Sequence, residues 1–225
     1  MNSFGPAAED EAMSPTNSID SSDALLIVDV QNDFVDGGAL PVRGGGWIVS
    51  LVNRLAAVFT QVVVTQDWHP RGHASFASSH PGAKPFDVAP MPYGDQVLWP
   101  DHCVQGTPGA ELHAGLDVGA AFLILRKGAN AAIDSYSAFT EADGKTTTGL
   151  AALLEARGVR RVFVCGLATD FCVAYSALDA RLAGFATLVV EDACRAIDAN
   201  GSLEAAWAKM NGAGVRRIQA FEILG

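Results

Sequence analysis

Apolar runs alternate along this chain with segments in which apolar residues recur at helical spacing. The clearest run covers residues 24–30, A-L-L-I-V-D-V, and it is continuous rather than alternating. A continuous run of this kind is typical of a strand buried on both faces of a parallel sheet. Because parallel strands need a crossover, usually a helix, the alternation predicts an α/β fold with right-handed connections.

Six segments are predicted to form strands and four to form helices. The strands are expected at residues 24–30, 61–65, 121–126, 162–165, 186–190 and 215–218, and the helices at residues 47–59, 148–157, 169–184 and 203–210. This order predicts a single-domain three-layer α/β/α sandwich around a central, mostly parallel six-stranded sheet of Rossmann-like type. Residues 66–119, rich in Pro, Gly, His and aromatics, are expected to form a long functional loop.

Residues 1–22 are expected to be a disordered tail, and residues 23–225 the folded domain. The tail is rich in Ser, Asp, Glu, Ala and Pro and has little to bury. It lacks the basic and apolar regions of a secretion signal. No apolar run approaches the ~20 residues that span a bilayer.

Charge and cysteine content narrow the class of partner. The formal charge is −10 and Lys and Arg form no cluster, which argues against nucleic acid or an anionic membrane surface as partners. The four cysteines match neither a small disulfide scaffold nor paired zinc knuckles. Reduced thiols in a cytoplasmic protein are therefore expected.

Residues 162–173, V-F-V-C-G-L-A-T-D-F-C-V, predict a strand, a tight turn and a helix. Thr169 or Asp170 is expected to cap the helix N-terminus, which places Cys172 in the first turn. The helix dipole and the converging backbone amides there favour a nucleophilic thiolate, and the same amides could hold an oxyanion. A structural interpretation stays open, because a free Cys on a helix face is commonly a core residue.

Three other predicted strands also end in reactive groups. Asp29 lies near the end of the first strand, Asp67 and His69 follow the second, and Lys127 ends the third. The carboxyl ends of parallel strands share one edge, where sites of α/β proteins form. A Cys nucleophile needs a base and a cation, which Asp29 and Lys127 could supply. Singly, Asp29 could cap a helix and Lys127 could be solvated, but their joint placement favours a site.

The segments D-W-H and W-P-D-H-C indicate a metal site. Asp67 and His69 are two residues apart, so an extended segment points both side chains to the same side. His102 is the third candidate ligand. Oxygen and nitrogen donors suit zinc, iron or manganese, and three protein ligands leave positions open for water or substrate.

Other residues compete for these roles. Cys103 is an alternative to His102 but faces the other way in an extended chain. His73 and His80 lie in the same loop and could also reach the ion. A His in a polar loop can equally be solvated and bind no metal. The argument for a metal site therefore rests on the third predicted strand, which ends beside these histidines.

Five motifs together resemble a known family. They are D-V-Q-N-D-F (29–34), D-W-H-P (67–70), L-W-P-D-H-C-V-Q-G-T (98–107), R-K-G (126–128) and G-L-A-T-D-F-C-V (166–173). In this order they resemble the nicotinamidases, also called pyrazinamidases, of the isochorismatase-like hydrolase superfamily, from about residue 24 to residue 221. The Asp, Lys and Cys set is shared across that superfamily, and the D-W-H and W-P-x-H-C segments are the more specific part.

The resemblance implies hydrolysis of nicotinamide to nicotinate and ammonia in NAD salvage, with pyrazinamide as a further substrate. Cys172 would form a thioester, Asp29 would carry the proton to ammonia and Lys127 would hold the pair. The backbone amides of Ala168 and Cys172 would form the oxyanion hole, with a cis peptide between Leu167 and Ala168.

The resemblance also implies how the substrate and the metal are held. Phe34 and Trp99 would sandwich the pyridine ring, a use that suits flat apolar side chains. One divalent ion, zinc first and otherwise iron or manganese, would bind Asp67, His69 and His102 and take the ring nitrogen or the attacking water. Some relatives have a fourth ligand shortly after the D-x-H motif, and a homo-oligomer is compatible with the family.

Two rival interpretations remain at this stage. Another amidase of the superfamily, acting on a carbamoyl or ureido substrate, would use the same Asp29, Lys127 and Cys172 but would generally lack the metal segment. A non-catalytic binding module could keep the fold alone. The intact set of three reactive residues argues against the module, because buried charges are costly in a scaffold.

Overall fold

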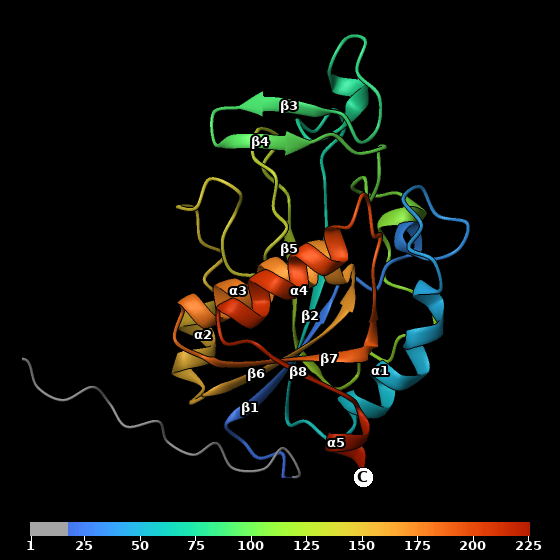
Figure 1. The fold of residues 1–225 in the computed structure, drawn as a ribbon. Helices are drawn as coiled ribbons and strands as arrows, with labels where there is room; N and C mark the ends of the chain where they lie inside the picture. The colour runs from blue at the N-terminus through green and yellow to red at the C-terminus, as the bar shows by residue number, and fades with distance from the viewer. Residues whose placement is uncertain (1–17) are drawn as a thin grey trace, which may run out of the picture.

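The computed structural model describes residues 18–225, which form a six-stranded sheet in the order β5-β2-β1-β6-β7-β8 (Figure 1). Every neighbouring pair in this sheet is parallel. The strands are β1 (Asp23–Val28), β2 (Gln61–Asp67), β5 (Ala121–Lys127), β6 (Arg161–Leu167), β7 (Ala186–Arg195) and β8 (Arg216–Ile218). The predicted α/β class and all six predicted strands are confirmed.

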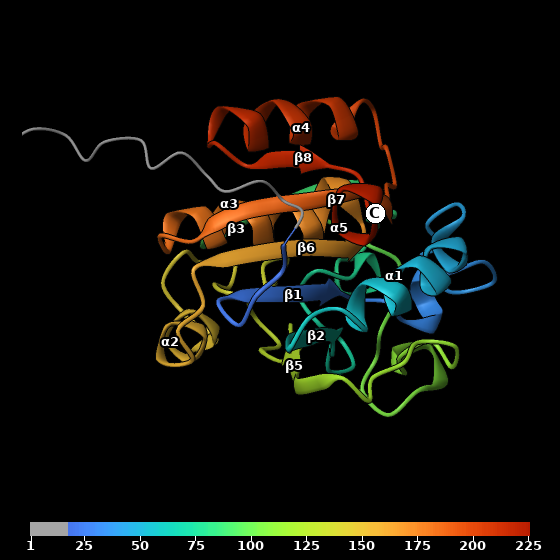
Figure 2. The ribbon, with the colours of Figure 1, turned by 90° about the horizontal axis from the view of Figure 1, so that it is seen from below.

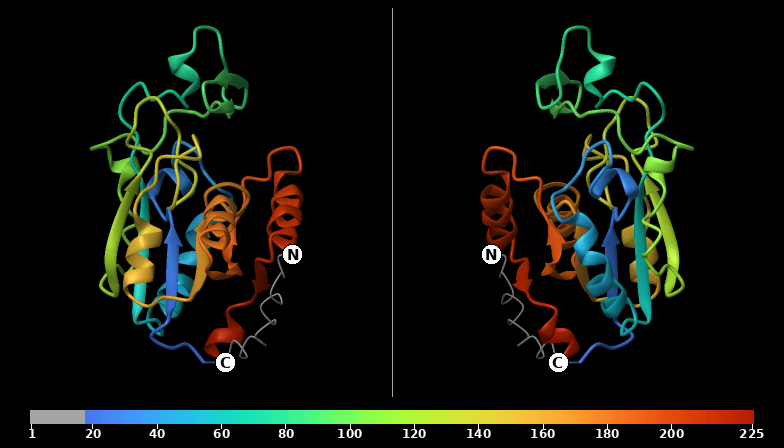
Figure 3. Two further views of the ribbon diagram at one scale, coloured as in Figure 1. Left: turned by 90° about the vertical axis from the view of Figure 1, so that its left-hand side faces the viewer. Right: turned by 90° about the vertical axis from the view of Figure 1, so that its right-hand side faces the viewer.

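Helices cover both faces of the sheet. They are α1 (Val49–Ala56), α2 (Leu150–Ala156), α3 (Ala174–Leu182), α4 (Ser202–Gly212) and α5 (Phe221–Leu224). Helix α1 lies on one face, and α2, α3 and α4 lie on the other (Figures 2 and 3). This division follows from right-handed crossovers, because the chain moves outward from β1 to β2 and then returns across the sheet to β6. The predicted three layers are therefore present.

The central strands account for the continuous apolar runs. Every residue of β1 and of β2 is buried, as are all but the first residue of β6. Leu25, Leu26 and Ile27 are each at most 1% exposed. Burying one such side chain stabilises the fold by about 1.5–3 kcal/mol, so the middle of each of these strands is apolar on both faces.

The long span between β2 and β5 is more ordered than the sequence predicts. It contains a hairpin of β3 (Val88–Met91) and β4 (Gly94–Val97), as well as the short 3₁₀ turns η3 (Ala77–Ser79) and η4 (Pro108–Ala110). The strands are only four residues long and largely exposed, so they carry no strong periodic signal. The hairpin stands over the carboxyl ends of the sheet strands (Figures 1 and 3).

A second difference lies between β6 and α3. A π-helical turn, η5 (Thr169–Val173), precedes α3, and no side chain caps it. The prediction that Thr169 or Asp170 caps an α-helix is therefore wrong. The carboxylate of Asp170 instead accepts hydrogen bonds from the segment before and at the start of α4, at Ile197, Asp198 and Ser202. Single π-helical turns are frequent at functional sites.

Two further 3₁₀ turns, η1 (Asn32–Phe34) and η2 (Gly45–Ile48), lead from β1 into α1. Within residues 18–225, none of the helices combines the length and apolar character needed to cross a bilayer. The predicted tail over residues 1–22 falls mostly outside the described residues and stays a prediction.

Gly166 allows β6 to approach β1 closely, and its replacement should destabilise the fold. Its φ is +118°, and a Cβ there would overlap the backbone of Val28. Gly158 is a matched control, because its φ is +77° but open space surrounds it. We expect Gly158→Ala to lower the free energy of unfolding by about 1 kcal/mol and Gly166→Ala by about 3 kcal/mol or more. Urea unfolding measures both, and equal losses would contradict the packing argument.

Candidate active site

Four reactive side chains meet at the carboxyl-end edge of the sheet. Asp29 follows β1, Asp67 ends β2, Lys127 ends β5 and Cys172 lies in η5 after β6. Asp67 and Lys127 are register partners on adjacent strands, which places them side by side. All four side chains are buried. The structure thus brings together the residues that the sequence predicts to meet.

The Lys127 ammonium group lies at the centre of this cluster. Its Nζ is 2.8 Å from Asp29 Oδ2, 3.1 Å from Asp67 Oδ1 and 3.4 Å from Cys172 Sγ, and it donates to the Ser135 carbonyl at 2.9 Å. An ammonium group has three hydrogens, so four neighbours compete for them. Burial alone would lower the pKa of Lys127, but the carboxylates of Asp29 and Asp67 raise it well above its usual value. Lys127 is therefore a permanent cation.

Asp29 is held in place by Thr65. The Thr65 hydroxyl donates to Asp29 Oδ1 at 2.6 Å, and the Asp29 backbone N–H donates to the same hydroxyl oxygen at 3.1 Å. Burial raises the pKa of Asp29, while Lys127 opposes this effect. A carboxylate with a raised pKa is a better proton acceptor than an ordinary one. Asp29 is thus suited to take a proton from a neighbouring thiol.

Cys172 is a buried thiol. Burial raises its pKa well above the usual value, Lys127 lowers it, and the carboxylates of Asp29 and Asp67 raise it further. This direction is opposite to the thiolate that the sequence predicts, because full burial beside two carboxylates outweighs the effect of the helical turn. The thiol is therefore protonated at rest and needs the adjacent base.

Asp67, His69 and His102 form a cluster whose ligand atoms all lie within 4.8 Å of one another. The Nδ1 atoms of His69 and His102 face the backbone carbonyls of Gly128 and Pro100, at 3.0 and 2.8 Å. A carbonyl only accepts hydrogen bonds, so each Nδ1 carries a proton, and in the neutral imidazole each Nε2 has a lone pair available.

These lone pairs point at the same carboxylate oxygen. The Nε2 atoms of His69 and His102 lie 2.9 and 3.4 Å from Asp67 Oδ2. Three potential ligand atoms this close together suit a shared cation, and carbonyl-bound Nδ1 atoms are typical of histidines that bind metals. The donor set therefore fits a divalent metal ion.

Gly128 lets the chain pass close to this cluster. Its φ is +68°, and a Cβ at this position would lie 2.6 Å from His69 Cε1 and 2.9 Å from Asp67 Oδ1. Only glycine combines this backbone conformation with so close an approach. The glycine of the R-K-G motif thus shapes the metal cluster.

The competing ligands are engaged elsewhere. His73 lies near His69 and Asp134, but its Nε2 contacts the Asn130 carbonyl at 2.8 Å and its Nδ1 contacts the Ser75 hydroxyl at 2.7 Å. His80 Nε2 likewise contacts the Ala74 carbonyl. Cys103 is buried outside the ligand cluster. His102 rather than Cys103 therefore lies with Asp67 and His69.

A pocket opens between the thiol and the metal cluster. Phe34 and Trp99, both predicted from the sequence, line it. Sequence reasoning missed Leu40, Asp134, Tyr136, Phe171 and Ile197, which also line it. These residues lie in loops and in η5, where no periodic pattern of apolar residues identifies those that line a pocket. The only signal was the position of Tyr136 a few residues after the R-K-G motif.

The aromatic wall is fixed by edge contacts and a hydrogen bond. The Trp99 and Phe171 ring centroids are 4.9 Å apart, and Trp99 Nε1 donates to the Tyr136 hydroxyl at 2.9 Å. The peptide between Leu167 and Ala168 is cis, as the resemblance implies. Ala168 lines the pocket beside Cys172.

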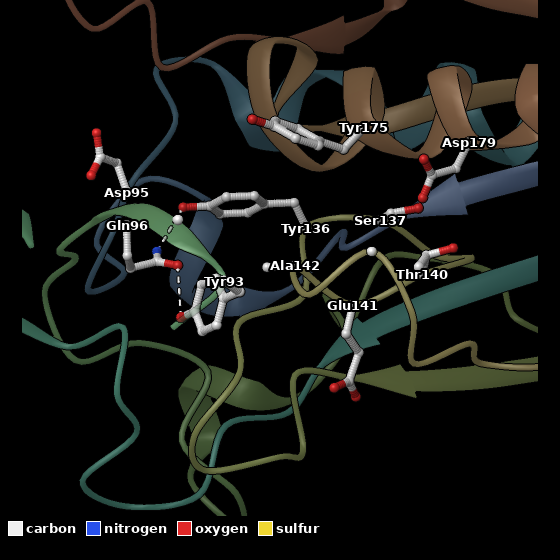
Figure 4. Close-up of a pocket in the computed structure, with 12 residues that line it drawn as sticks. Tyr93, Asp95, Gln96, Tyr136, Ser137, Thr140, Glu141, Ala142, Tyr175 and Asp179 are labelled. Carbon is white, nitrogen blue, oxygen red and sulfur yellow. Dashed lines mark hydrogen bonds between the residues drawn. The ribbon is translucent and has the colours of Figure 1, made fainter. Parts of the chain in front are cut away.

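A larger hollow of about 360 Å³ adjoins this pocket and shares Tyr136 with it (Figure 4). Tyr93, Tyr175, Glu141 and Asp179 are among its lining residues. Within the described residues, no Cys, His or Lys lines it. The reactive chemistry therefore belongs to the smaller pocket, although the neighbouring hollow is more open.

Comparison with known proteins gives a family match over most of the chain. The isochorismatase domain model matches residues 23–220. A nicotinamidase of Acinetobacter baylyi is 56% identical over 201 residues, which cover 89% of this chain and 94% of that protein.

Solved structures agree with this match. A nicotinamidase/pyrazinamidase structure of Acinetobacter baumanii has a TM-score of 0.89 and 55% identity, and covers 90% of this chain and 98% of that one. A pyrazinamidase of Pyrococcus horikoshii in complex with zinc has a TM-score of 0.71 and 36% identity, and the match covers 88% of this chain and 99% of that one.

The pKa direction at Cys172 predicts how its alkylation depends on pH. Only the thiolate reacts with iodoacetamide, so we expect slow labelling at pH 7 and faster labelling as the pH rises. Lys127→Met should slow labelling at each pH, because Lys127 lowers the thiol pKa. Mass spectrometry of the peptide with Cys172, from pH 6 to 10, measures the rate, with Cys172→Ala as the labelling control. Fast, pH-independent labelling from pH 6 upward would instead indicate a resting thiolate.

Proposed function

The chain belongs to the isochorismatase domain family and is an amide hydrolase that acts on nicotinamide, and we propose that Cys172, Asp29 and Lys127 carry out this hydrolysis through a thioester. One observation carries this proposal. The Lys127 ammonium group lies within 3.4 Å of both the Asp29 carboxylate and the Cys172 sulfur, at the wall of an aromatic pocket. A nucleophile, a base and a cation are thus in mutual contact.

In the first half of the reaction, Asp29 takes the proton from Cys172 Sγ as the sulfur attacks the amide carbonyl carbon. A C–S bond forms, and the carbonyl electron pair moves to oxygen. Lys127 stabilises the sulfur while it carries negative charge. Asp29 then gives the same proton to the amide nitrogen, the C–N bond breaks and ammonia leaves. A thioester on Cys172 remains.

In the second half, water attacks the thioester and Asp29 accepts its proton. The C–S bond breaks, the proton returns from Asp29 to the sulfur of Cys172, and nicotinic acid leaves and ionises to nicotinate by losing its carboxyl proton to water. The raised pKa of Asp29, caused by burial and opposed by Lys127, suits a group that must gain and lose a proton in each half-reaction.

The negative charge on the carbonyl oxygen needs donors in both halves. We propose the backbone N–H groups of Ala168 and Cys172 as this oxyanion hole. Both residues line the pocket, at the start and within the π-helical turn η5. The amide would lie here while the pyridine ring lies between Phe34 and Trp99, whose flat apolar faces suit it.

We propose that Asp67, His69 and His102 hold one divalent ion, with zinc first and iron or manganese as alternatives. The donor geometry described above and the zinc complex of the Pyrococcus horikoshii pyrazinamidase support this proposal. When bound, the ion would supply a Lewis acid for the ring nitrogen or for the attacking water. His73 is not included, since both of its ring nitrogens are hydrogen-bonded elsewhere.

We also propose a second substrate, a metabolic role, domain bounds and a cellular location for this protein. Pyrazinamide, which carries the same amide on a diazine ring, is expected as a second substrate, and nicotinate formation fits NAD salvage. We propose a single domain over residues 23–225 and a cytoplasmic location. Four free cysteines and a net charge of −10 support that location and a small neutral amide, rather than nucleic acid, as the partner.

Removal of the nucleophile is the first test. We expect Cys172→Ala to lower ammonia release from nicotinamide by about 10⁴-fold or more while the fold remains intact, because the variant lacks the sulfur that forms the acyl intermediate. Cys194→Ala is the matched control, a buried cysteine outside the pocket, and should keep its activity. Substantial turnover by Cys172→Ala would remove Cys172 from the mechanism.

Metal removal is the second test. Chelation followed by dialysis should lower nicotinamide turnover, and one divalent ion should restore it, because the cluster of Asp67, His69 and His102 fits a single ion. His102→Ala should weaken metal binding by more than the roughly 10- to 100-fold that loss of an outer partner costs. His113→Ala is the control outside the cluster. Unchanged turnover by protein shown to be metal-free would contradict the ligand assignment.

A further inference from the structure

Asp134 is a buried acidic residue that the mechanism above does not use. It lies in the loop that follows β5 and is only 2% exposed. It lines the same pocket as Asp67, His69 and His102. A carboxylate placed there without a role would be a cost to the fold, since burial disfavours charge.

The contacts of Asp134 are hydrogen bonds to neutral donors. Its Oδ2 accepts from Gln96 Nε2 at 2.7 Å, and its Oδ1 accepts from the Ser135 backbone N–H at 2.8 Å. Within residues 18–225, no Lys or Arg forms an ion pair with it. Gln96 comes from the β3–β4 hairpin, so this bond also ties the hairpin to the pocket.

Asp134 stands just outside the candidate metal ligands. One of its carboxylate oxygens lies within 4.8 Å of ring nitrogens of both His69 and His73. It is not a member of the group formed by Asp67, His69 and His102. Both of its oxygens accept hydrogen bonds that hold the carboxylate in place, and we assign it a position beside the ligands rather than among them.

The charges around the pocket do not balance without a cation. Three carboxylates are buried at or beside the pocket, and those of Asp29 and Asp67 share the single ammonium group of Lys127, while that of Asp134 forms no ion pair with a Lys or Arg of residues 18–225. The excess of two negative charges matches one divalent ion. In a buried site such charges act on each other strongly, because water does not screen them.

We propose that Asp134 is a positioning residue of the metal site, whose carboxylate sets the affinity for a divalent cation from outside the ligand set. This inference rests on the proposed function, since it takes the metal cluster as its premise. It also explains why a carboxylate that pairs with no Lys or Arg of residues 18–225 is tolerated in the pocket, since the bound cation compensates its charge.

Zinc binding by the full-length protein without substrate tests the proposal. Metal-free protein is titrated with Zn²⁺ against a chromophoric chelator. Asp134→Asn keeps the shape and removes the charge, and we expect it to bind zinc about 10- to 100-fold more weakly. Asp95→Asn removes an exposed charge from β4, and Gln96→Leu removes the hydrogen bond but keeps the charge of Asp134. Both variants should bind zinc with an affinity within about threefold of that of the natural protein.

Turnover measured at increasing zinc concentrations separates a role of Asp134 in metal affinity from a merely structural role. For Asp134→Asn, the zinc concentration for half-maximal activity should rise, while kcat at saturating zinc should stay within about threefold. Asp134→Glu keeps the charge and should bind zinc nearly as tightly as the natural protein does. If Asp134→Asn does not fold, this variant tests the proposal instead.

Three results would overturn the proposal. These are unchanged zinc affinity in Asp134→Asn, an equal loss in Gln96→Leu, or a loss in folded Asp134→Glu as large as that expected for Asp134→Asn. A zinc-loaded natural protein that releases no ammonia would instead refute the proposed function. The affinity comparison needs no turnover, so the two failures are distinguishable.

Discussion

The ion pairs of Lys127 hold the site and the carboxyl-end edge of the sheet together. One ammonium group joins Asp29 after β1, Asp67 at the end of β2 and Cys172 in η5. Removing one partner of such a buried pair leaves an uncompensated charge, which typically costs about 3–5 kcal/mol. The stability of this edge and the chemistry of the thiol therefore depend on the same atom. No conservative replacement of Lys127 can change one without the other.

Much of this arrangement could be predicted from the sequence, because it follows from local patterns and from topology. Continuous apolar runs identify the buried strands, and parallel strands place their carboxyl ends at one edge, so Asp29, Asp67 and Lys127 had to meet. The π-helical turn and the β3–β4 hairpin could not be predicted in the same way. Both depend on contacts with distant segments, such as those of Asp170 with the residues before α4, that no window of sequence contains.

The state of Cys172 shows how magnitudes decide between two valid arguments. A helix terminus stabilises a nearby anion by about 0.3–1 kcal/mol when exposed, and by up to ~2 kcal/mol in partly buried sites. Full burial can shift a pKa by as much as about 3–5 units, each equivalent to about 1.4 kcal/mol. Burial therefore outweighs the helical turn, and the thiol stays protonated even with Lys127 beside it. A base in contact with the thiol becomes a requirement of the fold, and Asp29 meets it.

Asp67 connects the two halves of the site because it uses both carboxylate oxygens. Its Oδ1 contacts Lys127 in the catalytic cluster, and its Oδ2 faces the lone pairs of His69 and His102. Burial alone would raise the pKa of Asp67, but the positive charge around it, including that of Lys127, lowers this pKa well below its usual value, so Asp67 is anionic toward both sides. A substitution at Asp67 would remove a metal ligand and unpair Lys127 at once. The separate contributions of metal and nucleophile can therefore be resolved only at residues that belong to one half, such as His102 and Cys172.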